Sequence, residues 1–361
     1  MTWVALRKPG LALFNAKGID AGPAPGAALP DGAISRGTLL LDAHVRPSLS
    51  TQTLLSYKAD HPSLSGLTIT LAPNGTVTLR QWQGQGLRHF VLRTDLQERA
   101  AGLTLLFTWD AAARRGALSV EVPGTGASWF TALRDPLLLP QECARRIATD
   151  RGAAFVSRSV GMVALADGVM PLGPLPSLGA QTLLETDAGQ RAISTLRPGA
   201  RVAVMDGSFA QVRWVGAVTL PAFDRFRPLR LRAPFYGAYR DLDCAACQQI
   251  RFRNSAVEYL FDTDAVSARA GDLLEGMADR RAPDQLTETY WQVVLDRSDP
   301  MQVHGLPCES LNVAPLLADP ALRALSVLGG VPLAVLPRRD GATPKRLQAY
   351  EVRSLCTLRA A

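Results

Sequence analysis

The sequence predicts an all-β protein with two domains, an N-terminal antiparallel β-sandwich and a C-terminal β domain with only minor helix. Three observations lead to this prediction. The chain has 361 residues, which is enough for two domains of ordinary size. Between residues 37 and 122, apolar runs of strand length alternate with turn-forming residues, and no helical period interrupts them. Hydrophobic residues make up 47% and charged residues 20%, a balance typical of folded domains.

The N-terminal half contains runs of strand length at TLLLDAHV, TLLSYKA, LTITLAP, TVTLRQW, HFVLRT, LTLLFTWD and ALSVEV. The clearest alternation is at Leu67, Ile69 and Leu71, which lead into an Asn74-Gly75 turn. An Asn-Gly pair between alternating runs is typical of a β-hairpin with one solvent-facing side. Such strands without helices predict an antiparallel sandwich. In pattern and strand order, the stretch resembles the laminin-G or concanavalin-like jelly roll.

Composition shifts give the expected domain boundaries. Residues 18–36 are rich in Gly, Ala and Pro, so we expect an arm or linker over residues 1–36 and the sandwich over 37–140. Residues 141–176 are expected to connect the domains, with QECARRIA forming one or two helical turns. The connector ends in a Gly-Pro-Leu-Pro stretch, which is unfavourable for helix and for central strand. The second domain is expected at 177–361.

Charge and cysteine content exclude several classes of protein. The net charge is +7, but the arginines are scattered singly along the chain, so we expect no nucleic-acid partner. No apolar run reaches the length of about 18 residues that a membrane span needs, and the N-terminus lacks the apolar core of a Sec signal. We therefore expect cytoplasmic synthesis, with any export or particle association by another route. Five cysteines at irregular spacing predict no disulfide framework.

The C-terminal half carries four ordered sequence blocks. The first has an LRPG turn at 196–199 and a WVG segment at 214–216. The others are FRPLRLRAPFYGAYRDLDCAACQQIRF, AVEYLFDTDAVSARAGDLLEG and TYWQVVLDRSDPMQVHGLPCESL. Together they cover about residues 177–311, and they resemble the bacterial Hint pattern, the hedgehog and intein type of domain. The resemblance implies a compact β domain that ends in a C-terminal extension.

The resemblance also implies where the reactive residues of a Hint domain would stand. Its chemistry needs a Cys or Ser that attacks the preceding carbonyl, and a His that protonates the departing nitrogen. Counting back from the LRPG turn places the nucleophile position at Ser177. The His of the second block is replaced by Gln248, and the His of an Asp-Arg-His pattern in the fourth block is replaced by Ser298. These degenerate positions imply a catalytically inactive Hint-like domain.

Metal sites are weakly indicated. The Cys244-Ala-Ala-Cys247 spacing, with His304 and Cys308, allows a zinc site to be imagined, but no second CxxC pair occurs. Ordinary buried thiols are the favoured interpretation, and we expect no metal. Loop carboxylates allow calcium as an alternative, although single aspartates in turns usually bond their own backbone. The aspartates concerned are Asp42, Asp60, Asp95 and Asp110.

Aromatic residues of the N-terminal half suggest a carbohydrate site, because aromatic faces suit the apolar faces of sugar rings. Trp82, Tyr57 and His89 are the candidate ligand-binding residues. Trp82 stands among glutamines and is expected to be exposed. Trp109 and Trp129 are further aromatic candidates, but Trp109 ends an apolar strand and is expected in the core.

These observations favour a non-enzymatic binding or structural protein. The leading hypothesis joins a glycan-binding jelly roll to an inactive Hint-like scaffold, displayed on a cell or particle surface. One alternative is an autoprocessing protein that cleaves before Ser177. Another is a purely architectural subunit whose partners are proteins.

Overall fold

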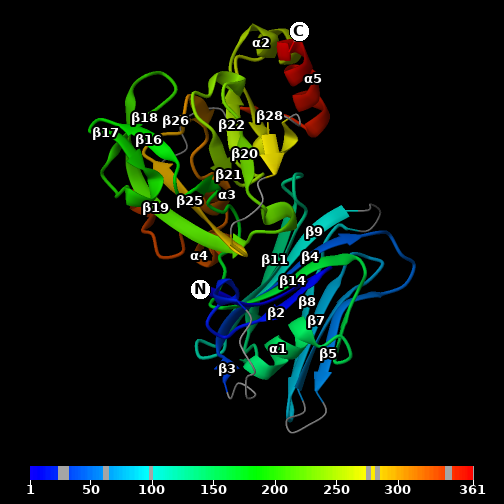
Figure 1. Cartoon of the computed structure of the whole chain (residues 1–361). Helices are drawn as coiled ribbons and strands as arrows, with labels where there is room; N and C mark the ends of the chain where they lie inside the picture. Colours follow the sequence, from blue (N-terminus) through cyan, green and yellow to red (C-terminus); the bar gives the residue numbers. More distant parts are fainter. Residues whose placement is uncertain are drawn as a thin grey trace. The chain divides into compact units, whose positions relative to one another are not determined.

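The computed structural model of the chain describes residues 1–22, 32–59, 65–96, 101–273, 278–280, 285–337 and 344–360. The chain divides into two compact units, Met1–Met170 and Pro171–Ala361 (Figure 1). Both consist mainly of antiparallel strands with a few short helices, which confirms the predicted all-β class. Within the described residues, no helix has the length and apolar character of a membrane span.

The first unit is a sandwich of two antiparallel sheets (Figure 1). In the described residues, one sheet has seven strands in the order β11-β10-β9-β4-β14-β1-β2, and the other has five in the order β13-β5-β6-β7-β8. A short pair, β12 and β3, lies outside these sheets. The elements are β1 (Thr2–Lys8), β2 (Leu11–Phe14), η1 (Ile19–Ala21), β3 (Ala33–Ile34), β4 (Arg36–Val45), β5 (Gln52–Ala59), β6 (Ser65–Leu71), β7 (Val77–Gln83), β8 (Gly86–Leu92), β9 (Ala101–Asp110), β10 (Arg115–Glu121), β11 (Ser128–Arg134), β12 (Leu139–Pro140), α1 (Gln141–Thr149), β13 (Ala154–Val156) and β14 (Val160–Asp167).

The predicted hairpin is confirmed in β6 and β7. Leu67, Ile69 and Leu71 are buried, and the two threonines between them are partly exposed. The turn contains Gly75 at φ 76°, a conformation that favours glycine. Ile69 lies opposite Leu79, so both strands turn their apolar sides to the same face. That face packs against the seven-stranded sheet in one hydrophobic core.

Aromatic residues fill much of this core. Trp109 is 1% exposed, as expected, and its Nε1 donates a hydrogen bond of 2.8 Å to the carbonyl of Ile34. Its ring stacks on Phe107 with centroids 5.0 Å apart. A Cβ on Gly37 would lie 2.3 Å from the Trp109 ring, so the close approach of strand and indole requires glycine there.

The sandwich is larger than the expected 37–140 segment. β1 lies within the expected arm, yet Trp3, Val4, Ala5 and Leu6 are buried and β1 pairs with β14 and β2. β14 lies within the expected connector, where it separates β4 from β1. Burial of these apolar strands offsets the entropy cost of bringing together segments that are far apart in the chain. The local Gly and Pro signals could not indicate this long-range pairing. The expected arm at 1–36 and connector at 141–176 are therefore corrected, although α1 forms where helical turns were predicted. Residues 23–31 of the expected arm lie outside the described residues.

The second unit is built around one continuous, mostly antiparallel sheet. Its order in the described residues is β24-β20-β21-β15-β25-β19-β18-β16-β26-β27-β22-β23-β28, with β17 paired to β16. The elements are β15 (Leu178–Gly179), β16 (Leu183–Thr186), β17 (Gly189–Ala192), η2 (Ile193–Thr195), β18 (Arg201–Ala203), β19 (Phe209–Pro221), η3 (Asp224–Phe226), β20 (Leu229–Leu231), η4 (Phe235–Gly237), β21 (Leu242–Cys244), β22 (Gln249–Phe252), α2 (Ser255–Phe261), β23 (Val266–Arg269), η5 (Ala270–Asp272), β24 (Ala278–Arg280), β25 (Thr287–Leu295), β26 (Met301–Val303), β27 (Leu306–Cys308), α3 (Ala314–Ala318), α4 (Pro320–Leu325), η6 (Leu333–Val335), β28 (Lys345–Arg346) and α5 (Ala349–Ala360).

The C-terminal elements complete the packing of this unit. Leu316 and Leu328 form a hydrophobic cluster with Trp214 of the long strand β19. Val352 and Leu355 of α5 join the main core of the unit, and α5 packs beside α2 (Figure 1). The C-terminal extension is therefore part of the folded unit.

Candidate functional site

Ser177 lies directly before β15, between two neighbouring segments of the sheet. Its N–H donates to the carbonyl of Trp291 on β25 at 3.3 Å, and its carbonyl accepts from the N–H of Ala245 at 2.7 Å. The residue is 5% exposed. These backbone bonds fix Ser177 inside the unit, and its side chain points to a buried polar cluster.

Gln248 closes a turn that directly precedes β22. Its N–H donates to the carbonyl of Ala245 at 3.0 Å, and its carbonyl accepts from the N–H of Ala270 at 2.8 Å. The turn packs closely against Gly271. A Cβ on Gly271 would lie 2.9 Å from the Cβ of Ala246, so there is no room for an alanine at position 271. Gln248 is 1% exposed. The turn thus delivers its side chain into the interior.

Three side chains meet in this cluster. The Ser177 hydroxyl donates to Gln248 Oε1 at 2.7 Å. Gln292 Nε2, from the middle of β25, lies 3.3 Å from Ser177 Oγ and 3.1 Å from Gln248 Oε1. Gln292 is 2% exposed, so the whole cluster is shielded from water. Sequence reasoning missed Gln292; its one signal was a single polar residue in the apolar run from Tyr290 to Leu295.

The backbone of Glu309 joins the cluster from the end of β27. Its carbonyl accepts from Gln248 Nε2 at 3.1 Å and from Gln292 Nε2 at 3.3 Å. Its carboxylate pairs with Arg251 through two hydrogen bonds of 2.7 and 3.0 Å. Burial raises the pKa of Glu309, and the Arg251 guanidinium opposes that rise. The ion pair anchors the segment whose carbonyl serves the two glutamines.

The cluster has a clear chemical limit. A primary amide neither takes up nor releases a proton near neutral pH, so neither glutamine is a general acid or base. The amides do satisfy the hydrogen-bonding capacity of a buried hydroxyl, which is otherwise costly to leave unpaired. The arrangement therefore suits stable packing of Ser177, and the side chains that contact its hydroxyl offer no route for proton transfer.

A family model described as the Hint domain matches residues 176–315. The second unit contains a Hint domain. The match begins one residue before Ser177, at the position where the sequence blocks placed the nucleophile. The described residues from 316 onward lie outside the range that the family model matches. No curated protein sequence matches the chain.

Several solved structures are similar to parts of this chain. The MchDnaB-1 intein is 14% identical, with a TM-score of 0.27, and the alignment covers 37% of this chain and 98% of the intein. The Ruminococcus gnavus IT-sialidase CBM40 bound to alpha2,6 sialyllactose is 12% identical, with a TM-score of 0.27 and coverage of 47% and 89%. The NanB sialidase from Streptococcus pneumoniae is 13% identical, with a TM-score of 0.27 and coverage of 52% and 36%. Because all three TM-scores are low, the Hint assignment rests on the family model.

Ser298, the remaining Hint position, and His304, a candidate zinc ligand, both lie outside the cluster. Ser298 is exposed in the segment after β25. His304 is buried, but both ring nitrogens are occupied: Nδ1 donates to the carbonyl of Asp241 at 2.9 Å, and Nε2 accepts from the N–H of Leu183 at 3.1 Å. The Leu183 N–H fixes this tautomer, because a donor must face an unprotonated nitrogen. Burial lowers the pKa of His304, so the ring is a neutral structural bridge.

The imagined zinc ligands do not converge. Cys244 and Cys308 are fully buried, whereas Cys247 is exposed. Burial raises the pKa of both buried thiols. Within the described part of the chain, no three His, Cys, Asp or Glu side chains are grouped as a metal site would need.

The aspartates considered for calcium have local partners or stand apart. Asp110 pairs with Arg36 at 3.1 Å and accepts from the N–H of Ala113, as a turn-forming aspartate does. Asp42 accepts from Thr104 Oγ1 at 3.2 Å. Asp95 is exposed, and Asp60 lies outside the described residues.

The structure separates the three expected glycan-binding residues. Tyr57 is 1% exposed because the alternation of β5 turns it inward with Leu55, so its assignment as a ligand contact is wrong. Trp82 and His89 both point away from the core on the outer face of the five-stranded sheet; His89 is exposed and Trp82 partly buried. Two of the three residues therefore remain together on one surface.

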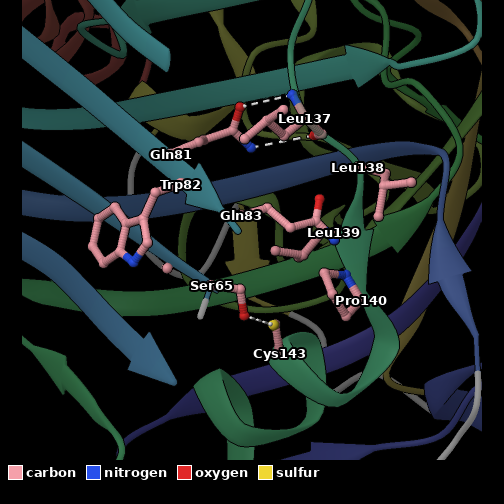
Figure 2. A pocket seen from close by; sticks show the side chains of 10 residues that line it. Ser65, Gln81, Trp82, Gln83, Leu137, Leu138, Leu139, Pro140 and Cys143 are labelled. Atoms are coloured by element: carbon pink, nitrogen blue, oxygen red, sulfur yellow. Dashed lines mark hydrogen bonds between the residues drawn. The ribbon is translucent and has the colours of Figure 1, made fainter. Parts of the chain in front are cut away.

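A small pocket lies beside Trp82 (Figure 2). Gln81, on the opposite side of β7, binds the backbone of Leu137 through its amide, with bonds of 3.2 and 3.3 Å. Ser65 Oγ and Cys143 Sγ are 3.4 Å apart at the other end of the pocket. Its cavity volume of about 10 Å³ suits about one water molecule and is too small for a sugar ring.

Proposed function

We propose that this chain is a non-enzymatic Hint-domain protein, whose Hint domain is a rigid scaffold that does not cleave the chain. One observation carries this proposal: the hydroxyl of Ser177 contacts the amides of Gln248 and Gln292. Neither amide can accept the proton that a serine nucleophile must lose.

The expected loss of rate is large. Attack of Ser177 Oγ on the carbonyl of Pro176 would require deprotonation of the hydroxyl and protonation of the departing nitrogen. General acid and base catalysis typically contributes about 10²–10⁴-fold to such a reaction. The buried hydrogen bonds also hold the hydroxyl in a stable ground state, which adds no transition-state stabilisation.

The test is the intact mass of the purified full-length chain after incubation with hydroxylamine, which cleaves an ester formed at Ser177. The Ser177→Ala variant is the matched control. We expect one full-length species in both. Two fragments that meet between Pro176 and Ser177 in the wild type, absent from the control, would establish the autoprocessing alternative.

A second proposed activity is glycan recognition by the N-terminal sandwich. The supporting observation is Trp82: a Cβ built on Gly66 would lie 2.0 Å from the Trp82 ring, so the indole lies over the backbone of β6 on the outer sheet face. A ring supported in this way can offer its other face to a sugar. Binding of the full chain to a glycan array, compared with Trp82→Ala, tests it.

Surface display and protein partners belong to the same proposal. Protease accessibility on intact cells or particles tests display. If the chain binds no glycan and co-purifies with a defined protein partner, the architectural alternative replaces glycan recognition.

A further inference from the structure

We propose that the outer face of the five-stranded sheet binds an anionic glycan, one that carries carboxylate or sulfate groups, with Arg80, His89 and Trp82 as its principal contacts. This inference rests on the proposed glycan recognition and specifies its site and ligand class.

Charge is distributed unevenly over the five strands. β5, β6, β7, β8 and β13 contain Lys58, Arg80, Arg88 and His89 and contain no Asp or Glu. Arg88 has a structural role, because its Nε donates to the carbonyl of Asp135 at 2.7 Å. In the described residues, neither Arg80 nor His89 has a side-chain hydrogen bond or ion pair, and both are exposed. Their donors are therefore available to a ligand.

The strand register gathers polar groups into one row. His89 lies opposite Arg80, Arg80 opposite Thr68, and Thr68 opposite Ser56, with Phe155 next in line on β13. Side chains directly opposite one another share a face and stand about 4.5–5.5 Å apart. The Ser56 and Thr68 hydroxyls are 3.2 Å from each other. The row thus runs from two nitrogen donors through two hydroxyls to an exposed aromatic ring.

The adjacent row supplies the stacking platform. Lys58, Gly66, Trp82 and Leu87 lie opposite one another across β5 to β8. Gly66 has no side chain, and the Trp82 indole occupies the space above it. The row of Trp82 is next to the row that contains Arg80 and His89. Lys58 is exposed at the end of this row.

This combination favours an anionic sugar over a neutral one. A guanidinium binds a carboxylate or sulfate through two parallel hydrogen bonds, and an aromatic face packs against the apolar face of a sugar ring. No Asp or Glu stands on these strands, and within the described residues no carboxylate competes for Arg80 or His89. A neutral glycan could stack on the Trp82 ring but would have no negative charge to pair with Arg80.

The test measures binding of the full-length chain to three soluble polymers: polygalacturonate, which carries carboxylates, dextran sulfate, and neutral dextran. The double variant Arg80→Gln/His89→Gln is compared with a matched control, Arg134→Gln/His44→Gln, which removes an exposed Arg and His from the seven-stranded sheet. Thermal melting checks that both variants fold. We expect tighter binding to one or both anionic polymers than to dextran, and a loss of about tenfold or more in the first variant alone, as for one charge-assisted hydrogen bond.

The polymer that binds more tightly identifies carboxylate or sulfate as the recognised group. Equal binding to dextran, equal loss in both variants, or equal competition by duplex DNA would overturn this inference while array-detected glycan binding still stands. Absence of binding to the polymers and to every glycan on the array would overturn both proposals.

Discussion

The hydroxyl of Ser177 donates a hydrogen bond of 2.7 Å to the side-chain oxygen of Gln248. The Hint resemblance predicts that these two residues stand at the positions of the nucleophile and of the proton donor. The bond joins residues 71 positions apart in the chain. An amide oxygen opposite the hydroxyl makes the pair a buried structural contact, and this has consequences for stability.

Replacement of Gln248 by alanine should destabilise the Hint domain. The variant removes the acceptor of the Ser177 hydroxyl and the donor to the carbonyls of Gln249 and Glu309. Unpaired buried polar groups cost about 1–3 kcal/mol, so we expect a loss of that size in the free energy of unfolding. Urea denaturation of the full-length chain measures it.

Gln190→Ala is the matched control, because Gln190 is exposed and its amide contacts Glu185. We expect a change within about 0.5 kcal/mol for this control. If both variants lose the same stability, the buried amide cluster does not have the structural role assigned to it.

Stability of the Hint domain should fall in mild acid because of His304. Burial lowers the pKa of His304 below its ordinary value of 6.5, so the unfolded chain binds a proton more readily than the folded one. The stabilisation is full above pH 6.5 and is lost as the pH falls toward the folded pKa. The slope is at most about 1.4 kcal/mol per pH unit. Protonation would also place an N–H of the ring against the N–H of Leu183.

The His304→Asn variant separates this effect from other titrating groups. Asparagine does not titrate, and it tolerates the positive φ of 52° at this position. Glu309 acts in the opposite sense, since its raised pKa favours the folded state at low pH, and it is present in both proteins. Melting temperatures between pH 7.5 and 5 should diverge. Parallel curves would contradict the structural role of the neutral ring.

Chelation should leave the Hint domain unchanged. Cys244 and Cys308 are buried thiols with raised pKa values, and His304 already bonds two backbone groups. Dialysis against EDTA should shift the melting temperature by less than the error of the measurement, because structural zinc would contribute to folding directly. A fall of several degrees that zinc reverses would revive the zinc hypothesis.

Glycan binding should depend on the support beneath Trp82 as well as on the indole itself. Gly66→Val places atoms where the ring now lies, so the ring must move. Trp82→Ala removes the ring, and a stacked aromatic contributes about 0.5–1.5 kcal/mol, which corresponds to about 2- to 10-fold in affinity. We expect losses of this size in both variants. Gly102→Val is the control, since no atom lies within 4 Å of a Cβ at Gly102. Unchanged binding in Gly66→Val would place the sugar elsewhere.

Apolar runs of strand length between turn signals, several of them alternating, were enough to predict the sandwich strands from β4 to β10. In β6, apolar residues at every second position determine which side faces the core, whatever the neighbouring strands are. The same rule could have placed Tyr57 correctly, because it shares the buried side of β5 with Leu55. We predicted Tyr57 as a ligand contact because it is aromatic, and did not apply the alternation of β5 to it.

The polar cluster of the Hint domain was predicted only in part. Ordered blocks located Ser177 and Gln248, since the spacing from recognisable turns is a property of the sequence. Gln292 and the carbonyl of Glu309 could not be predicted as their partners, because a hydrogen bond between residues 115 positions apart has no local signal. Likewise, the burial of His304 depends on three separated segments.

The sequence by itself predicted the all-β class and the inward side of the alternating strands, and its Hint resemblance placed Gln248 and Ser298 at the proton-transfer positions. The tertiary structure decided that β1 and β14 complete the sandwich, that Trp82 and His89 share a face, and that two glutamines enclose Ser177. The physical reason is the range of each interaction. Alternation and turn preference act between residues a few positions apart, whereas sheet closure and buried hydrogen bonds depend on which distant segments the folded core brings together.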